Sequence, residues 1–165
     1  MQTQPLVVRR HPLRAATDAD LKEQFDIAIR IRDKVSEANN AVIQIREIKK
    51  QVGERTAKAS DAALKTSGDR LTTNLTSVEE EIYQTRNQSG QDPLNFPIKI
   101  NNRIAGINRV VNTGDGKPIG SVYEIFKEVT AELKVQTDRL QQVLAKDLAA
   151  FNVEAKRAGV APINP

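Results

Sequence analysis

The side chains able to do acid–base or metal chemistry are few in this sequence. His11 is the only histidine and there is no cysteine, which excludes a Ser-His-Asp triad and a zinc site of His and Cys ligands within this chain. Glu79, Glu80 and Glu81 form a run of carboxylates. A di-iron bundle site needs Glu-x-x-His pairs that face inward, whereas consecutive residues fan around a helix. We therefore expect these acids to lie on a solvated face, and we expect no catalysis, no metal and no cofactor.

A glycine-rich segment, TGDGKPIGS at residues 113–121, has some features of a phosphate-binding loop. It lacks the G-x-x-x-x-G-K-[ST] spacing, and no strand precedes it. The spacing of its Asp and Gly residues also differs from that of an EF-hand loop. We interpret this segment as a flexible connection between helices.

The most unusual stretch is SGQDPLNFPIKINNRIAGI, residues 89–107, in which prolines, an aromatic residue and asparagines are close together. We interpret it as a corner between two helices. Gly90 is expected to end a helix in a left-handed conformation, and Asp92 and Pro93 to start a turn. Asn95 is expected to cap the next helix, with Pro97 in its first turn.

The apolar and amide side chains of this corner are expected to hold it in place. Leu94 and Phe96 would fill the end of the bundle, and Asn101 or Asn102 would hydrogen-bond the loop backbone. The alternative interpretation is a small polar recognition patch at one tip of the molecule.

Composition and periodicity predict an all-α domain. The 165 residues are 39% hydrophobic and 28% charged, with only 4% aromatic, which is typical of a globular protein with an aliphatic core. Apolar stripes predict helices at about 18–59, 60–87, 97–112 and 121–158. The first carries a heptad repeat that includes Ile31, Ala38, Ile45 and Val52, which favours coiled-coil-like packing. An elongated antiparallel bundle of three long helices and one short helix would bury all the stripes.

Local signals predict several helix ends and one close contact. Thr17 is a good N-cap for the first helix, and the pair Ser121 and Glu124 fits a capping box for the last. Gly159 suits the left-handed position after a helix. Gly68 lies within a helix at a cost of about 1 kcal/mol relative to alanine, which predicts a close helix–helix contact there.

Residues 1–16 are expected to form an extended arm and linker, separate from the helical domain at 17–165. Val7 and Val8 favour a short strand, and an isolated strand has unpaired backbone groups that can pair with another chain. The candidate interaction residues are therefore Leu6, Val7, Val8, Arg9 and Arg10.

The arm also carries the only concentrated basic charge. The chain has a net charge of +4, and Arg9, Arg10 and Arg14 lie in the arm, whereas the helices mix acidic and basic residues. An alternative function is thus a basic-arm module that binds nucleic acid or an anionic surface, although the mixed charge of the helices disfavours nucleic acid. No run of 18 apolar residues is present, so we expect no membrane span.

Several segments resemble one known family. SGQDPLNFPIKINNRIAGI, QFDIAIRIRDKVSEANNAVIQIR, SVYEIFKEVTAELKVQTDRLQQVL and FNVEAKRAGVAPI resemble the C-terminal helical region of bacterial sortilin-like, BNR-repeat β-propeller proteins, which are described as glycosyl hydrolases. TQPLVVRR is similar to the final strand of the Ig-like domain that precedes the helices in that family. The resemblance covers nearly the whole chain.

The resemblance implies that this chain corresponds to the C-terminal part of a larger periplasmic or extracellular protein, and no signal peptide is recognisable here. It contains no propeller repeats, and a glycosidase needs two carboxylates placed in a sugar-binding cleft. Glycosidase activity is therefore not transferred to it. The expected role is a non-catalytic accessory domain whose partners are the upstream propeller and Ig-like domains or a second copy of itself.

Overall fold

The computed structural model describes residues 3–9, 11–13 and 15–164, without the side chain of Pro93. Its elements are α1 (Asp18–Lys58), α2 (Ala62–Ile82), a 3₁₀ turn (Asp92–Leu94), α3 (Ile100–Val111), α4 (Gly120–Val143), a π-helical turn (Leu144–Leu148) and α5 (Ala149–Arg157). The described residues contain no strand. The predicted all-α helical bundle is confirmed.

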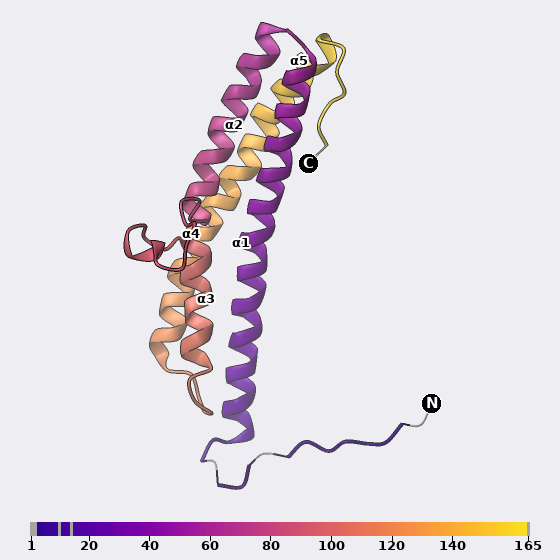
Figure 1. Cartoon of the computed structure of the whole chain (residues 1–165). Helices are drawn as coiled ribbons and strands as arrows, with labels where there is room; N and C mark the ends of the chain where they lie inside the picture. The colour runs from indigo at the N-terminus through magenta and orange to yellow at the C-terminus, as the bar shows by residue number, and fades with distance from the viewer. Residues whose placement is uncertain (1–2, 10, 14, 165) are drawn as a thin grey trace.

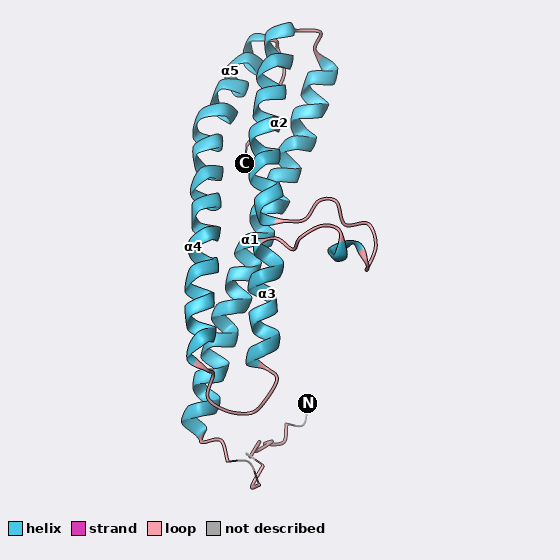
Figure 2. Cartoon of the chain, turned by 90° about the vertical axis from the view of Figure 1, so that its left-hand side faces the viewer, coloured by secondary structure: helices cyan, strands magenta, loops and turns pink. Residues whose placement is uncertain are grey.

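The bundle is elongated and consists of three helical rods (Figures 1 and 2). α1 runs the length of the molecule, and α2 followed by α3 returns antiparallel to it. α4, the π turn and α5 form the third rod, which runs parallel to α1. α2 and α3 contact both other rods, so the short helix extends the rod begun by α2 instead of lying beside it.

The predicted apolar stripes form the core. In α1 the heptad positions Ile31, Ala38, Ile45 and Val52 are all buried. Ile27, Ala41 and Ile48 are also buried, so the stripe is wider than a strict coiled-coil seam. None of the described helices has both the length and the apolar character needed to cross a membrane.

Gly68 allows the close contact that its position predicts. A Cβ atom at this residue would lie 3.0 Å from Cγ2 of Thr56 and 3.1 Å from Cγ1 of Val52, both on α1. The same Cβ would lie 3.4 Å from Cε2 of Phe151 on α5. The glycine therefore brings all three rods together at this level.

The start of α1 agrees with the prediction and the start of α4 does not. Thr17 Oγ1 accepts a hydrogen bond from the Asp20 amide (3.1 Å), and Asp20 Oδ2 accepts one from the Thr17 amide (2.9 Å). The predicted capping box of Ser121 and Glu124 is wrong, because Ile119 occupies the N-cap position and provides no side-chain acceptor. Ser121 lies inside the first turn, where its hydroxyl is two residues too late to act as the cap.

The end of α5 is a Schellman motif centred on Gly159. Gly159 has φ +73°, its amide donates to the Lys156 carbonyl (3.1 Å), and the Val160 amide donates to the Ala155 carbonyl (2.9 Å). This is the pattern of paired 5→2 and 6→1 hydrogen bonds that a left-handed glycine permits. The turn directs residues 160–164 back along the bundle.

Replacing Gly159 with alanine is expected to lower the free energy of unfolding by about 1 kcal/mol, because a Cβ atom is strained at positive φ. Gly106 in α3 is the matched control, since it is exposed and a Cβ there would meet no atom within 4 Å. Gly106→Ala is expected to stabilise the protein by up to about 1 kcal/mol through helix propensity. Urea unfolding of both variants checks the opposite signs, and a stabilising Gly159→Ala would contradict the assignment.

Candidate interaction site

The N-terminal arm leads away from the bundle beyond the start of α1 (Figure 1). Residues 3–9 belong to no sheet, and Leu6, Val7 and Val8 are 88%, 72% and 86% exposed. Arg9 is exposed as well, whereas Arg10 and Arg14 lie outside the described residues. The predicted strand is therefore not paired within this chain, and a run of apolar side chains is left in contact with solvent.

The segment between α2 and α3 projects from the side of the bundle, about halfway along its length (Figure 2). The predicted plug at the end of the bundle is therefore wrong. Leu94 is exposed, and Phe96 is half-buried under the Arg86 guanidinium, whose carbon lies 5.8 Å from the ring centroid. The corner occurs where α2 ends and α3 begins within one rod, so no bundle end is available for these side chains to fill.

Asp92 organises this side loop. One of its carboxylate oxygens accepts hydrogen bonds from the backbone amides of Gln88 and Ser89, the latter at 2.7 Å, and the other accepts one from the Ser89 hydroxyl at 2.8 Å. These hydrogen bonds, the one from the Gln88 amide first, lower the pKa of Asp92 below its ordinary value of 3.8. The 3₁₀ turn Asp92–Leu94 begins at this residue, with Pro93 in its first turn.

The expected helix caps at this corner are wrong. Among described residues only Gly159 has positive φ, so Gly90 forms no left-handed cap, and α2 already ends at Ile82. Asn95 follows the 3₁₀ turn, and α3 begins at Ile100 without a side-chain cap. The chain leaves the helix early because Gln84 is buried and its Nε2 donates to the Pro97 carbonyl at 2.8 Å, which closes the neck of the loop.

Asn101, one of the two asparagines expected to bond the loop backbone, contacts a neighbouring helix instead of the loop. It is buried, and its Nδ2 lies 3.4 Å from Oδ1 of Asn39 on α1. Its own Oδ1 accepts a hydrogen bond from the Asn102 amide at 2.8 Å. The residue thus provides a polar contact between α3 and α1.

Two buried carboxylates were not identified as such from the sequence. Glu79 is only 4% exposed, and its oxygens accept hydrogen bonds from Arg46 Nε (2.6 Å) and Lys49 Nζ (3.0 Å) on α1. Glu80 and Glu81 are exposed, so the expected solvated face is right for two of the three acids and wrong for Glu79. The pairing makes Glu79 a link between α1 and α2.

Asp147 is the second buried carboxylate and lies on the π turn. Its Oδ1 is 3.0 Å from Arg70 Nε, and its Oδ2 accepts a hydrogen bond from Asn74 Nδ2 at 2.8 Å. Both partners belong to α2. The π turn therefore carries a buried polar contact between the second and third rods, which explains its conformation without requiring a ligand.

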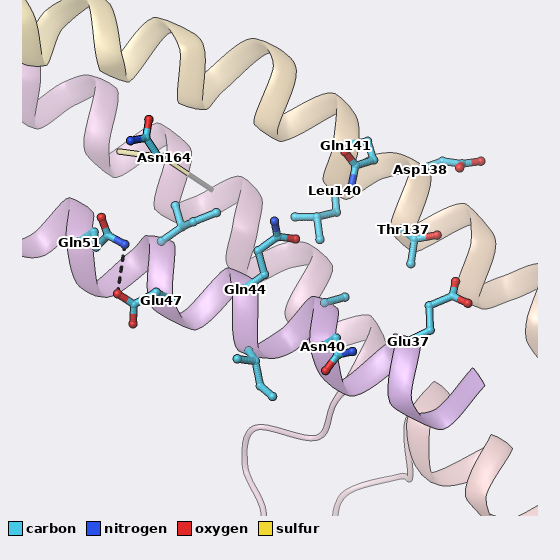
Figure 3. Close-up of a pocket in the computed structure, with 13 residues that line it drawn as sticks. Glu37, Asn40, Gln44, Glu47, Gln51, Thr137, Asp138, Leu140, Gln141 and Asn164 are labelled. Atoms are coloured by element: carbon cyan, nitrogen blue, oxygen red, sulfur yellow. Dashed lines mark hydrogen bonds between the residues drawn. The ribbon is translucent and has the colours of Figure 1, made fainter. Parts of the chain in front are cut away.

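A groove of about 750 Å³ lies between α1 and α4 (Figure 3). Its floor contains the apolar side chains of Ala41, Ile48 and Leu140. Amide side chains border it, and Gln44 reaches from α1 toward α4 while Leu140 reaches from α4 toward α1. An open groove with an apolar floor and amide walls can hold an extended segment of polypeptide, because the amides can bond its backbone.

The described residues contain no group of three or more His, Cys, Asp or Glu side chains that could hold a metal ion. Comparison of the chain with protein-family models, with curated proteins and with solved structures gives no match. The exposed arm and the α1–α4 groove are the two features described above that can bind another molecule.

Proposed function

We propose that this chain is a non-catalytic helical interaction domain, an accessory part of a larger propeller protein of the glycosyl-hydrolase type to which its sequence bears a resemblance. The arm, residues 3–9, is the element that engages another polypeptide. The bundle is the rigid body that carries the arm.

The observation that carries this proposal is the exposure of Leu6, Val7 and Val8 in a segment outside any sheet. Solvation of three adjacent apolar side chains is unfavourable, at about 25 cal/mol per Å² of apolar surface. Extended backbone also has amide and carbonyl groups that form a ladder with an adjacent strand. Pairing with another polypeptide would bury the side chains and satisfy the backbone together.

Two partners fit this chemistry. The resemblance of TQPLVVRR to the last strand of an Ig-like domain implies that the sheet of a preceding domain can accept the arm. A second copy of this chain is the other partner, since the same exposed residues occur on every copy.

The test compares the full chain with a variant that lacks residues 1–10. At a concentration where both proteins are monomeric, we expect them to unfold at the same temperature, because the arm contributes nothing to the bundle core and association would itself stabilise the folded chain. We expect any association at higher concentration to require the arm. Light scattering measures the mass and circular dichroism the melting temperature. A melting temperature that falls by several degrees on deletion would make the arm part of the fold and contradict the proposal.

The basic-arm alternative is distinguished in the same preparation. Arg9→Glu is titrated against a labelled DNA duplex beside the unchanged chain at two salt concentrations. Binding that falls steeply with salt and is lost in Arg9→Glu would favour nucleic-acid recruitment over polypeptide recognition.

A further inference from the structure

We infer that the groove between α1 and α4 receives the N-terminal arm of a second copy of this chain, so that two copies exchange arms. The inference rests on the proposed function of the arm as a polypeptide-binding element, and it adds the receiving site and the identity of the partner.

The C-terminal tail shows how this face holds an extended segment. Residues 160–164 belong to no helix, yet Ile163 is only 1% exposed. Its backbone makes two hydrogen bonds to the amide of Asn152, with the Ile163 amide donating to Oδ1 (2.7 Å) and the Ile163 carbonyl accepting from Nδ2 (2.9 Å). Arg55 Nε donates to the Ala161 carbonyl at 2.9 Å. One buried apolar side chain and hydrogen bonds from side chains to the backbone thus hold this extended tail against the bundle.

The groove continues the path of this tail and offers the same chemistry. Asn164 forms one end of it (Figure 3). Asn40, Gln44, Gln51 and Gln141 supply further amides along its walls. Ile43 adds an apolar side chain that is 64% exposed, and the buried floor is apolar. The arm has the matching features of extended backbone and three consecutive apolar side chains.

Charge complementarity favours the arm as the occupant. The residues that line the groove include Glu37, Glu47 and Asp138 but no lysine or arginine. Glu37 and Asp138 pair with Lys34 and Lys134 on the surface, whereas Glu47 accepts a hydrogen bond from Gln51 and has no ion pair with the described part of the chain. Arg9, next to the apolar run, provides the cation for this acid.

The distances favour a second copy over the chain's own arm. From Thr17 to Gln44 the helix rises about 40 Å at about 1.5 Å per residue. The stretch from Thr17 back to Val7 spans at most about 36 Å when fully extended, and Ala16 is buried against the bundle, which fixes the start of that stretch. The apolar residues of the arm therefore fall short of the middle of their own groove.

The mass of the full chain is measured by light scattering over a hundredfold range of concentration. We expect an arm-dependent dimer whose dissociation constant rises about tenfold or more in Ile43→Lys, which places a cation on the groove. Ile125→Lys on α4 is the matched control, because Ile125 is 48% exposed and does not line the groove. It should dimerise like the unchanged chain.

A charge exchange tests the polar contact. Arg9→Glu should weaken the dimer, and combining it with Glu47→Arg should restore most of the lost affinity. If the arm-dependent dimer is unaffected by Ile43→Lys, the groove is not the site that binds the arm. The proposed function of the arm would then still hold. A full chain that stays monomeric at every concentration would overturn the exchange of arms, and the melting temperature of the arm-deleted chain still tests the proposed function.

Disulfide trapping separates exchange from self-binding, since the chain has no cysteine of its own. Val7→Cys in one copy and Gln44→Cys in a copy with a size tag should form a crosslinked pair when mixed and oxidised. Lys127→Cys, at an exposed position of α4 outside the groove, replaces Gln44→Cys in the control. Equal crosslinking to both positions would overturn the inference, as would a crosslink within one chain when Val7 and Gln44 are both replaced in it.

Discussion

Replacing Phe151 with alanine is expected to lower the free energy of unfolding by about 3–5 kcal/mol. Phe151 is 0% exposed, and its ring faces the backbone of α2 at Gly68, where the three rods meet. Truncation leaves a cavity at this level, and the helical rods on either side cannot collapse into it without losing the contacts of Gly68 with α1. Urea unfolding followed by circular dichroism measures the change.

Phe25→Ala is the matched control, because Phe25 is 63% exposed on α1. Its truncation removes the same atoms from a solvated position, and we expect a change within about 0.5 kcal/mol. A native domain is stable by only about 5–15 kcal/mol, so the first variant should lose a substantial share of its stability and the second almost none. Similar losses in the two variants would contradict the packing of α5 against α2.

The extent of α1 and the C-terminal end of α5 could be predicted because local signals and periodicity agree there. Thr17 and Asp20 form the cap immediately before the apolar stripe of α1. Gly159 adopts the positive φ that the Schellman motif at the end of α5 requires. Where local sequence and tertiary packing favour the same conformation, single-sequence reasoning succeeds.

The end of α2 could not be predicted, because residues 83–87 are compatible with a helix and a distant contact decides their conformation. The bond from Gln84 to the Pro97 carbonyl joins the two sides of a loop. Nothing in the local sequence of either side specifies it. The same loop determines that Asn95 lies too early to cap α3.

The apolar pattern of the sequence did not predict the π turn. Leu140, Leu144 and Leu148 follow one another at the usual helical spacing of four residues, and Phe151 continues the stripe. In the structure Leu144 is only partly buried against the core, whereas Asp147 is buried. The extra residue of the turn depends on this packing, which the apolar pattern does not specify.

The burial of Glu79 could have been predicted from its position relative to the apolar stripe of α2. The buried stripe of α2 includes Leu75, Val78 and Ile82, and Glu79 is four residues after Leu75, on the edge of the same face. Glu80 and Glu81 rotate away from it. The sequence could not show that Arg46 and Lys49 of α1 would lie opposite, because this depends on the axial register of two helices.

Replacing Glu79 with glutamine is expected to lower the free energy of unfolding by about 1–3 kcal/mol at neutral pH, since hydrogen bonds to charged groups are worth that much. The amide cannot accept from Arg46 and Lys49 as strongly as the carboxylate does. Both cations retain partial access to water, which keeps the loss below that of a fully buried charge left unpaired. Glu80→Gln, at the exposed neighbouring position, should change stability by less than about 0.5 kcal/mol.

The effect of Glu79→Gln should depend on pH in a defined direction. Burial by itself would raise the pKa of Glu79, but the hydrogen bonds and charges of Arg46 and Lys49 outweigh it and hold the pKa below its ordinary value of 4.5. The unfolded chain therefore binds this proton first as the pH falls, and the carboxylate stabilises the fold fully above about pH 4.5. The difference in the free energy of unfolding between the unchanged chain and Glu79→Gln should be constant near neutral pH. It should shrink as the pH falls below about 4.5. A difference that grows on acidification would mean that Glu79 is stabilised in its protonated form, and the ion pairs would then not be what holds α2 against α1 at this level.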